Sequence, residues 1–220
     1  ILAIYYWSLP NGLFRLQAKP FDESKSGKGG FYDNLTSMDK KSKAEYNFDF
    51  EPTLQVPGDW NSQVEKLSFY EGTLWYKRDF VVAKKDDKKY FLHFGAVNYE
   101  SHVYLNGKKL GVHKGGFSPF QFDVSEKLND GKNFVVVMVD NTRKKDEVPT
   151  INTDWWNYGG ITRDVTLVST PKTFIEDYKV QLAKNNKDLV EGFVQINGVS
   201  KKETVQVEIP ELKIKSTFTT

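Results

Sequence analysis

The chain of 220 residues contains no cysteine and only two methionines. The absence of cysteine excludes a disulfide framework and any metal site built from thiolates. It does not place the chain inside or outside a cell. A chain of this length is sufficient for one large domain or two small ones.

An excess of one charge sign is also missing. Lysine and arginine total 31 and aspartate and glutamate total 29, so the formal net charge is +2. The lysines are scattered between acidic residues and do not form one basic stripe. Because a nucleic-acid-binding surface needs such a stripe or patch, we expect no nucleic-acid partner.

Long hydrophobic runs are absent from the sequence. The apolar start, ILAIYYWSLP, is too short to span a bilayer. It also lacks the basic segment and the small-residue cleavage site of a signal peptide. We therefore expect a first strand or an ordered tail here, and no membrane partner.

Aromatic residues, by contrast, are plentiful, at 15% of the chain. Apolar residues recur at nearly every second position in short segments separated by turn residues, among them LWYKRDFVV, KKYFLHF, SHVYLN and NFVVVMVDN. This pattern is typical of an all-β sandwich or barrel. The pair Asn106-Gly107 favours a two-residue hairpin turn, because both residues tolerate positive φ. Residues 17–53 show no clear period and are expected to form long loops.

A second run of strand patterns follows Pro171. Three segments, TFIEDYKVQLAK, DLVEGFVQING and ETVQVEIP, are predicted to be strands. Three strands alone could not bury both faces of a sheet unless they packed against other parts of the structure.

The most informative segment is DWWNYGGITRDVTLV, which begins an acidic and aromatic loop just ahead of a strand. Aromatic rings stack on the apolar C–H face of a pyranose, and carboxylate and amide groups bind its hydroxyls. The candidate substrate-binding residues are therefore Asp154, Trp155, Trp156, Asn157 and Tyr158. Because neighbouring residues of an extended chain point to opposite sides, one tryptophan is expected in the core and the other exposed. The alternative is a core tryptophan with an ordinary polar loop beside it.

This segment resembles the end of the N-terminal sugar-binding domain of glycoside hydrolase family 2, the family of β-galactosidases, β-glucuronidases and β-mannosidases. Other segments resemble the family in the same order, namely a weaker SLPNGLFRL, then VPGDWNSQ, YEGTLWYKRDFVV and the block from His93 to Ser125. The resemblance implies a jelly-roll β-sandwich of the galactose-binding type over residues 1–170. It also implies part of an immunoglobulin-like β-sandwich over 171–220, since a complete one takes roughly 100 residues.

The resemblance also implies where the chemistry lies. Family 2 enzymes retain configuration, which requires two carboxylates about 5–5.5 Å apart. In the family both are glutamates on a (β/α)₈ barrel of about 250 residues, which no part of this sequence resembles. We therefore expect a non-catalytic fragment of a β-galactosidase- or β-glucuronidase-like enzyme, whose β-linked glycoside binds through the barrel. Glu65, Glu71 and Glu100 are expected to be loop or strand-surface charges.

The resemblance implies a role in substrate binding for Asp154. The family's aspartate at this position reaches into the active site of the barrel and holds the sugar, in β-galactosidases partly through a bound sodium ion. The other sodium ligands would come from the barrel, so no cofactor and no complete metal site are expected in this chain. The structural alternative is that Asp154 only caps its own loop. A homo-oligomer of the full-length enzyme is compatible with the resemblance.

Two other functions stay open at this point. One is a free-standing carbohydrate-binding module without hydrolase activity, and the other is a domain that only buttresses a barrel. The half sandwich after Pro171 favours the enzyme fragment, because a module that stands alone would not end in one. The sequence does not distinguish a galactoside from a glucuronide.

Overall fold

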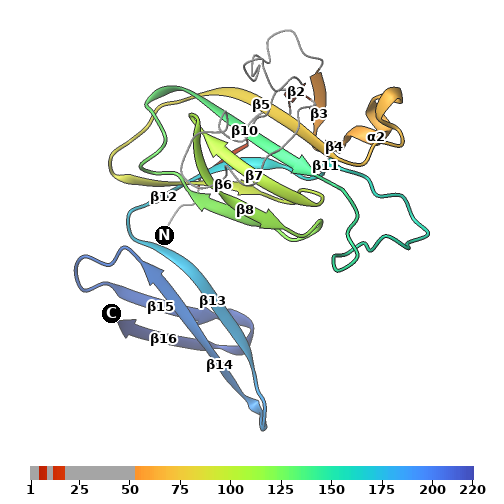
Figure 1. Ribbon diagram of the computed structural model, residues 1–220. Helices are drawn as coiled ribbons and strands as arrows, with labels where there is room; N and C mark the ends of the chain where they lie inside the picture. Colours follow the sequence, from red (N-terminus) through yellow and green to blue (C-terminus); the bar gives the residue numbers. More distant parts are fainter. Residues whose placement is uncertain (1–4, 9–11, 18–52) are drawn as a thin grey trace. The chain divides into compact units, whose positions relative to one another are not determined.

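A computed structural model describes residues 5–8, 12–17 and 53–220, and these residues are mostly β-strands (Figure 1). They divide into two compact units. One contains most of the strands up to Ser169, and the other contains Asp87–Lys89 and Thr170–Thr220. The loops expected at 17–53 lie almost wholly outside the described residues. The domain limits at 1–170 and 171–220 stay a prediction.

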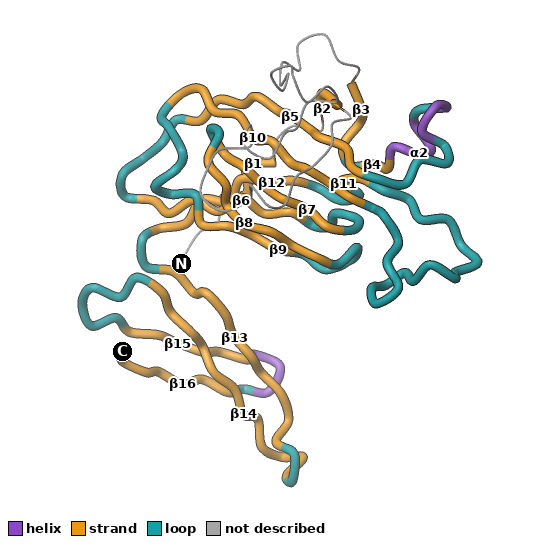
Figure 2. The backbone as a smooth tube through the Cα atoms, in the orientation of Figure 1, coloured by secondary structure: helices purple, strands orange, loops and turns teal. Residues whose placement is uncertain are grey.

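The first unit is built around two sheets (Figure 2). The larger sheet has six strands in the order β3 (Thr53–Val56), β2 (Gly12–Gln17), β5 (Thr73–Val82), β10 (Gly131–Asp140), β7 (Glu100–Leu105) and β8 (Lys108–Lys114). The smaller sheet has four, in the order β1 (Tyr5–Ser8), β12 (Val165–Pro171), β6 (Lys88–Phe94) and β9 (Phe120–Asp123). Every strand pair whose register is described is antiparallel.

The main hydrophobic core combines side chains from both sheets, including Leu74, Tyr76, Leu92, Phe94, Val103, Val135, Val137 and Leu167. Side chains alternate along a strand, so every second residue of β10 enters this core. The intervening residues Val136 and Met138 join Trp75 and Tyr104 in a smaller buried cluster. The prediction of an all-β sandwich is confirmed.

The turn between β7 and β8 follows the sequence signal. Asn106 has φ of 50° and Gly107 has φ of 82°, as a type I′ hairpin requires. The side chain of Asn106 also donates to Lys127 O at 2.9 Å and accepts from Phe134 N at 3.0 Å. The turn is therefore tied to two other parts of the unit.

The second unit contains two antiparallel hairpins. One is formed by β13 (Phe174–Ala183) and β14 (Asn186–Asn197), and the other by β15 (Thr204–Ile209) and β16 (Ile214–Thr219). The three-strand prediction missed β16, whose sequence IKSTFT has only two strongly apolar residues. Side chains of both hairpins line an open hollow of about 920 Å³, among them Val194, Ile196, Val205, Ile214 and Phe218.

Helical structure in the described residues is limited to three single turns. These are α2 (Trp60–Gln63), η2 (Glu65–Leu67) and η3 (Pro210–Leu212). Asp59 caps α2, since its carboxylate accepts from Ser62 N at 2.7 Å. No helix in this part of the chain is long and apolar enough to cross a membrane.

We expect Asn106→Ala to destabilise the first unit by about 2–4 kcal/mol. The substitution combines a strained left-handed alanine, at about 1–2 kcal/mol, with the loss of side-chain hydrogen bonds that leaves buried partners unsatisfied. Asn106→Gly removes only the hydrogen bonds and should cost about 1–2 kcal/mol less. Urea denaturation measures both values, and equal losses in the two variants would contradict the expected contribution of φ.

Candidate functional site

A loop of residues 141–159 connects β10 to β11 (Gly160–Ile161) at one end of the first unit, beside α2 (Figure 1). β11 pairs with β4 (Gly58–Asp59), with Gly160 opposite Asp59. Because α2 follows β4 directly, this pairing brings Trp60 to the base of the loop. The loop contains all five candidate substrate-binding residues.

Buried asparagine side chains hold the two ends of this loop together. Asn141 Nδ2 donates to Asn157 O at 2.8 Å, and the Asn157 side chain donates back to Asn141 O. Asn141 Oδ1 accepts from Gly72 N at 2.8 Å, which connects the loop to the start of β5. Asn98 Nδ2 donates to Asn157 Oδ1 at 3.1 Å. These amides satisfy backbone groups that would otherwise be buried without partners.

A fourth buried asparagine and a tryptophan complete the base. Asn61 Oδ1 accepts from Gly159 N at 2.9 Å, and its Nδ2 donates to Tyr70 O at 3.1 Å. The indole of Trp60, fully buried, lies directly against Gly159. A Cβ added at Gly159 would lie 2.1 Å from Trp60 Cζ2. Only glycine allows this approach of backbone to ring.

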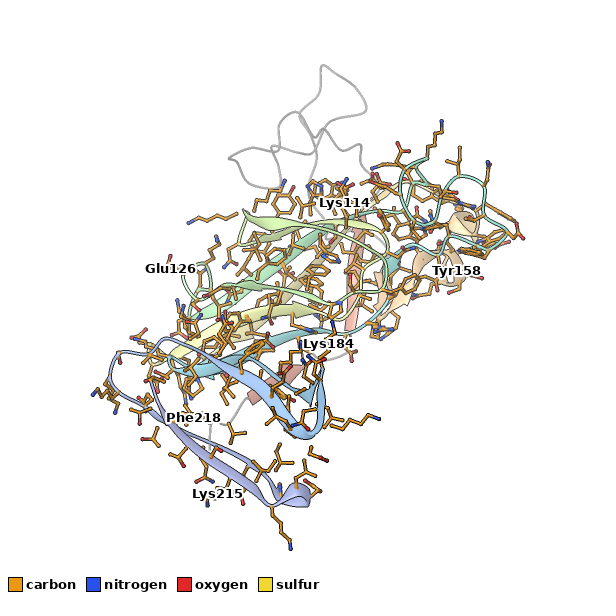
Figure 3. The ribbon with its side chains drawn as sticks, turned by 90° about the horizontal axis from the view of Figure 1, so that it is seen from below. Lys114, Glu126, Tyr158, Lys184, Lys215 and Phe218 are labelled. Carbon is orange, nitrogen blue, oxygen red and sulfur yellow. The ribbon has the colours of Figure 1, made fainter. Side chains whose placement is uncertain are left out.

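Above this base, the outer part of the loop is open to solvent. Trp155 is 65% exposed, Tyr158 is 51% exposed and Trp156 is 45% exposed. Asp154 is also exposed, and it makes no hydrogen bond or ion pair with any residue that the structure describes. Tyr158 is labelled at this end of the unit in Figure 3. We call Asp154, Trp155, Trp156 and Tyr158 the loop tip.

The two tryptophans do not divide between core and surface as the sequence suggested, because both are exposed. Alternation applies to an extended strand, whereas these residues lie in an irregular loop whose core position is filled by Trp60. Trp156 is nevertheless fixed, since its Nε1 donates to Ser68 O at 3.0 Å. The ring of Phe69, 82% exposed, meets it edge-on with 5.0 Å between ring centroids.

The structure therefore separates the five candidates into two groups. Asn157 is buried in the base, where its amide binds protein groups, and so it is placed to position the loop. Asp154, Trp155, Trp156 and Tyr158 stand at the tip, and their contact with substrate stays a prediction. Phe69 was missed by the sequence reasoning because it lies far from the motif, and its only signal was an apolar residue in a turn.

A group of charged residues lies beside the start of the loop, near Lys144 and Glu147. Glu100 was expected at the surface but is buried, and its Oε1 is 2.9 Å from His102 Nε2. Its Oε2 is 3.0 Å from Lys114 Nζ and 3.3 Å from Lys144 Nζ. The hydrogen bond from His102, together with the two lysines, lowers the pKa of Glu100 from 4.5 to about 2, although burial opposes the shift.

Glu71, expected to be a loop or strand-surface charge, forms an ion pair with Arg143 of the loop. Arg143 Nη2 lies 2.7 Å from Glu71 Oε1, and Arg143 Nη1 donates to Thr153 Oγ1 at 2.9 Å. Sequence reasoning could not pair these residues because they lie far apart along the chain.

The described residues do not form a metal centre of their own. No group of three or more His, Cys, Asp or Glu side chains in this part of the chain is arranged to hold an ion.

Comparisons with known sequences agree on one family. A family model described as "Glycosyl hydrolases family 2, sugar binding domain" matches residues 33–171. A β-galactosidase of Thermoanaerobacter pseudethanolicus is 38% identical over 112 residues, which are 49% of this chain and 15% of that protein. A β-glucuronidase of Bacteroides fragilis is 33% identical over 143 residues, which cover 59% of this chain and 20% of that protein. The chain thus spans a fifth or less of the length of these relatives.

Solved structures give a similar result. A β-glucuronidase from an uncultured Clostridium species superposes with a TM-score of 0.72 and 27% identity. The match covers 98% of this chain and 39% of that one.

We expect Gly159→Ala to destabilise the first unit by about 3 kcal/mol, the upper end of typical overpacking costs, because the added methyl group overlaps a buried indole. Gly131→Ala is the control. Gly131 has φ of 85° and open space around it, so its substitution should cost only about 1–2 kcal/mol. Thermal or urea unfolding compares the two, and a milder loss at position 159 would show that the loop base can relax.

The lowered pKa of Glu100 predicts a loss of stability in acid. The ionised form is favoured in the folded state, so its contribution is complete above about pH 4.5 and disappears as the pH falls toward 2. Glu100→Gln should lower stability at pH 7 by about 1–3 kcal/mol and flatten the decline between pH 4.5 and 2. The exposed Glu126 is a matched control, and Glu126→Gln should leave the stability at pH 7 unchanged.

Proposed function

Because the chain belongs to glycosyl hydrolase family 2, we propose that it is the sugar-binding part of a retaining β-glycosidase that acts on β-linked glucuronides or galactosides. Support comes from the family match and from relatives named β-glucuronidase and β-galactosidase. The chain corresponds to a small part of each relative. The activity proposed is therefore that of a longer polypeptide, and the paired catalytic carboxylates are assigned to its other parts.

The loop tip is the contribution of this chain to the site. The observation that carries the proposal is an exposed carboxylate and three exposed aromatic rings on a base of buried hydrogen bonds. Aromatic faces can stack on sugar C–H groups, and Asp154 can accept hydrogen bonds from sugar hydroxyls. The buried hydrogen bonds of the base hold both ends of the loop before the substrate arrives, which reduces the entropy lost on binding.

We infer that a glucuronide is at least as compatible with the chain as a galactoside. The named structural relative at 27% identity is a β-glucuronidase, and the sequence relatives carry both names. Parallel assays with nitrophenyl β-glucuronide and nitrophenyl β-galactoside on the full polypeptide would identify the substrate.

In the full polypeptide, Asp154→Ala should lower kcat/KM by about 10- to 100-fold with little change in melting temperature. One hydrogen bond to a charged group is worth about 1.5–3 kcal/mol, and about 1.4 kcal/mol corresponds to tenfold in rate. Asp154→Asn should recover part of the loss if hydrogen bonding dominates over charge.

The control is Asp146→Ala, which removes an exposed carboxylate from the same loop. Its kinetics should match the wild type. Unchanged kinetics in both Asp154 variants would leave Asp154 with only a local structural role. A large fall in melting temperature with a proportionate loss of activity would lead to the same conclusion.

A further inference from the structure

We propose that Arg143 is a positioning residue for Asp154, because it links Thr153, the residue just before Asp154, to Glu71. We call this link the clamp. The inference rests on the proposed function, because it assumes that Asp154 contacts the substrate. Arg143 itself does not need to touch the sugar.

The guanidinium group of Arg143 joins two segments that are far apart in sequence. Its Nε donates to Glu71 Oε1 at 2.7 Å, and its Nη2 lies 2.7 Å from the same oxygen. On the other side, Nη1 donates to Thr153 Oγ1 at 2.9 Å and to Thr153 O at 3.4 Å. The planar fork of an arginine can serve both partners at once, whereas a lysine is a point charge on a flexible stem.

Backbone hydrogen bonds contribute little to fixing this part of the loop, and its other side-chain anchor is Trp156, whose Nε1 donates to Ser68 O. Within residues 142–156, the backbone–backbone hydrogen bonds described are limited to one, from Glu147 N to Lys144 O. The buried asparagines hold only the ends at Asn141 and Asn157. The chain between these ends therefore depends on side-chain contacts for its position.

The charged group around Glu100 does not replace the clamp. Lys144 and Glu147, in the first half of the loop, pair with each other and with Glu100 of β7 and Lys114 of β8. Arg143, by contrast, holds both the hydroxyl and the carbonyl of Thr153, the residue immediately before Asp154. Because the ion pair between Arg143 and Glu71 is partly shielded from solvent, with side chains 22% and 32% exposed, solvent and salt weaken it less than a fully exposed pair.

Small displacements matter at such a position. A misplacement of about 1 Å in a group that orients a substrate can reduce the rate by about 10²-fold. Without the clamp, Asp154 would still be present, but its carboxylate would occupy a wider range of positions.

The test is a double-mutant cycle in the full polypeptide, measured well below the melting temperature. We expect Arg143→Gln to lower kcat/KM by roughly 10-fold, and Glu71→Gln to do the same. If Arg143 acts through Asp154, then Arg143→Gln should cause no further loss in an Asp154→Ala background. Additive losses would overturn the proposal, since they would show that Arg143 acts independently of Asp154.

Lys145→Gln is the matched control, because Lys145 is an exposed cation on the same loop that pairs with no residue in the described part of the chain. Its kinetics should equal those of the wild type. Arg143→Lys should restore little activity, because an ammonium group cannot hold Glu71 and both Thr153 oxygens together. Full rescue by lysine would overturn the clamp.

Amide hydrogen exchange provides a readout independent of activity. In Arg143→Gln, peptides covering residues 150–156 should exchange faster, while peptides of β10 should be unchanged. Unchanged exchange at 150–156 would overturn the clamp. If Asp154→Ala slows the enzyme and Arg143→Gln does not, only this inference fails. If Asp154→Ala is silent as well, the proposed role of Asp154 in substrate binding fails with it.

Discussion

The arrangement of the site depends on the contact between the backbone of Gly159 and the indole of Trp60. Trp60 is part of the main core, while Gly159 ends the loop that carries Asp154. The contact is reinforced on both sides, because Trp60 N donates to Gly159 O and Gly159 N donates to Asn61. These bonds anchor the end of the loop to a residue of the sandwich core.

Two kinds of polar interaction hold different parts of the loop in place. Amide side chains fix its ends, where the surroundings are buried and neutral partners avoid the desolvation penalty of charges. Ion pairs fix its middle, where partial exposure lowers that penalty. Glu100 is the exception, a buried carboxylate that is stabilised by three cationic or hydrogen-bonding partners at once.

Much of the fold follows from the sequence, because period-two patterns in segments such as NFVVVMVDN specify which side chains face the core. The turn at Asn106-Gly107 was predictable from its two residues, because both tolerate positive φ. β16 was not, since polar residues fill most of its positions. The site was predictable only in part. The motif identified the loop, but local patterns could not show that Asn157 turns inward or that both tryptophans face out. Arg143 and Glu71 meet only because of the tertiary fold.

The separation of a fixed base from an open tip has a consequence for how this protein can change over evolutionary time. Substitutions at Trp155 or Tyr158 alter a surface that bears little of the packing, so they are close to neutral for folding. Substitutions at Asn141 or Gly159 are not, because each would disturb several buried partners. The chemistry of the tip can therefore change through single substitutions that leave the scaffold intact.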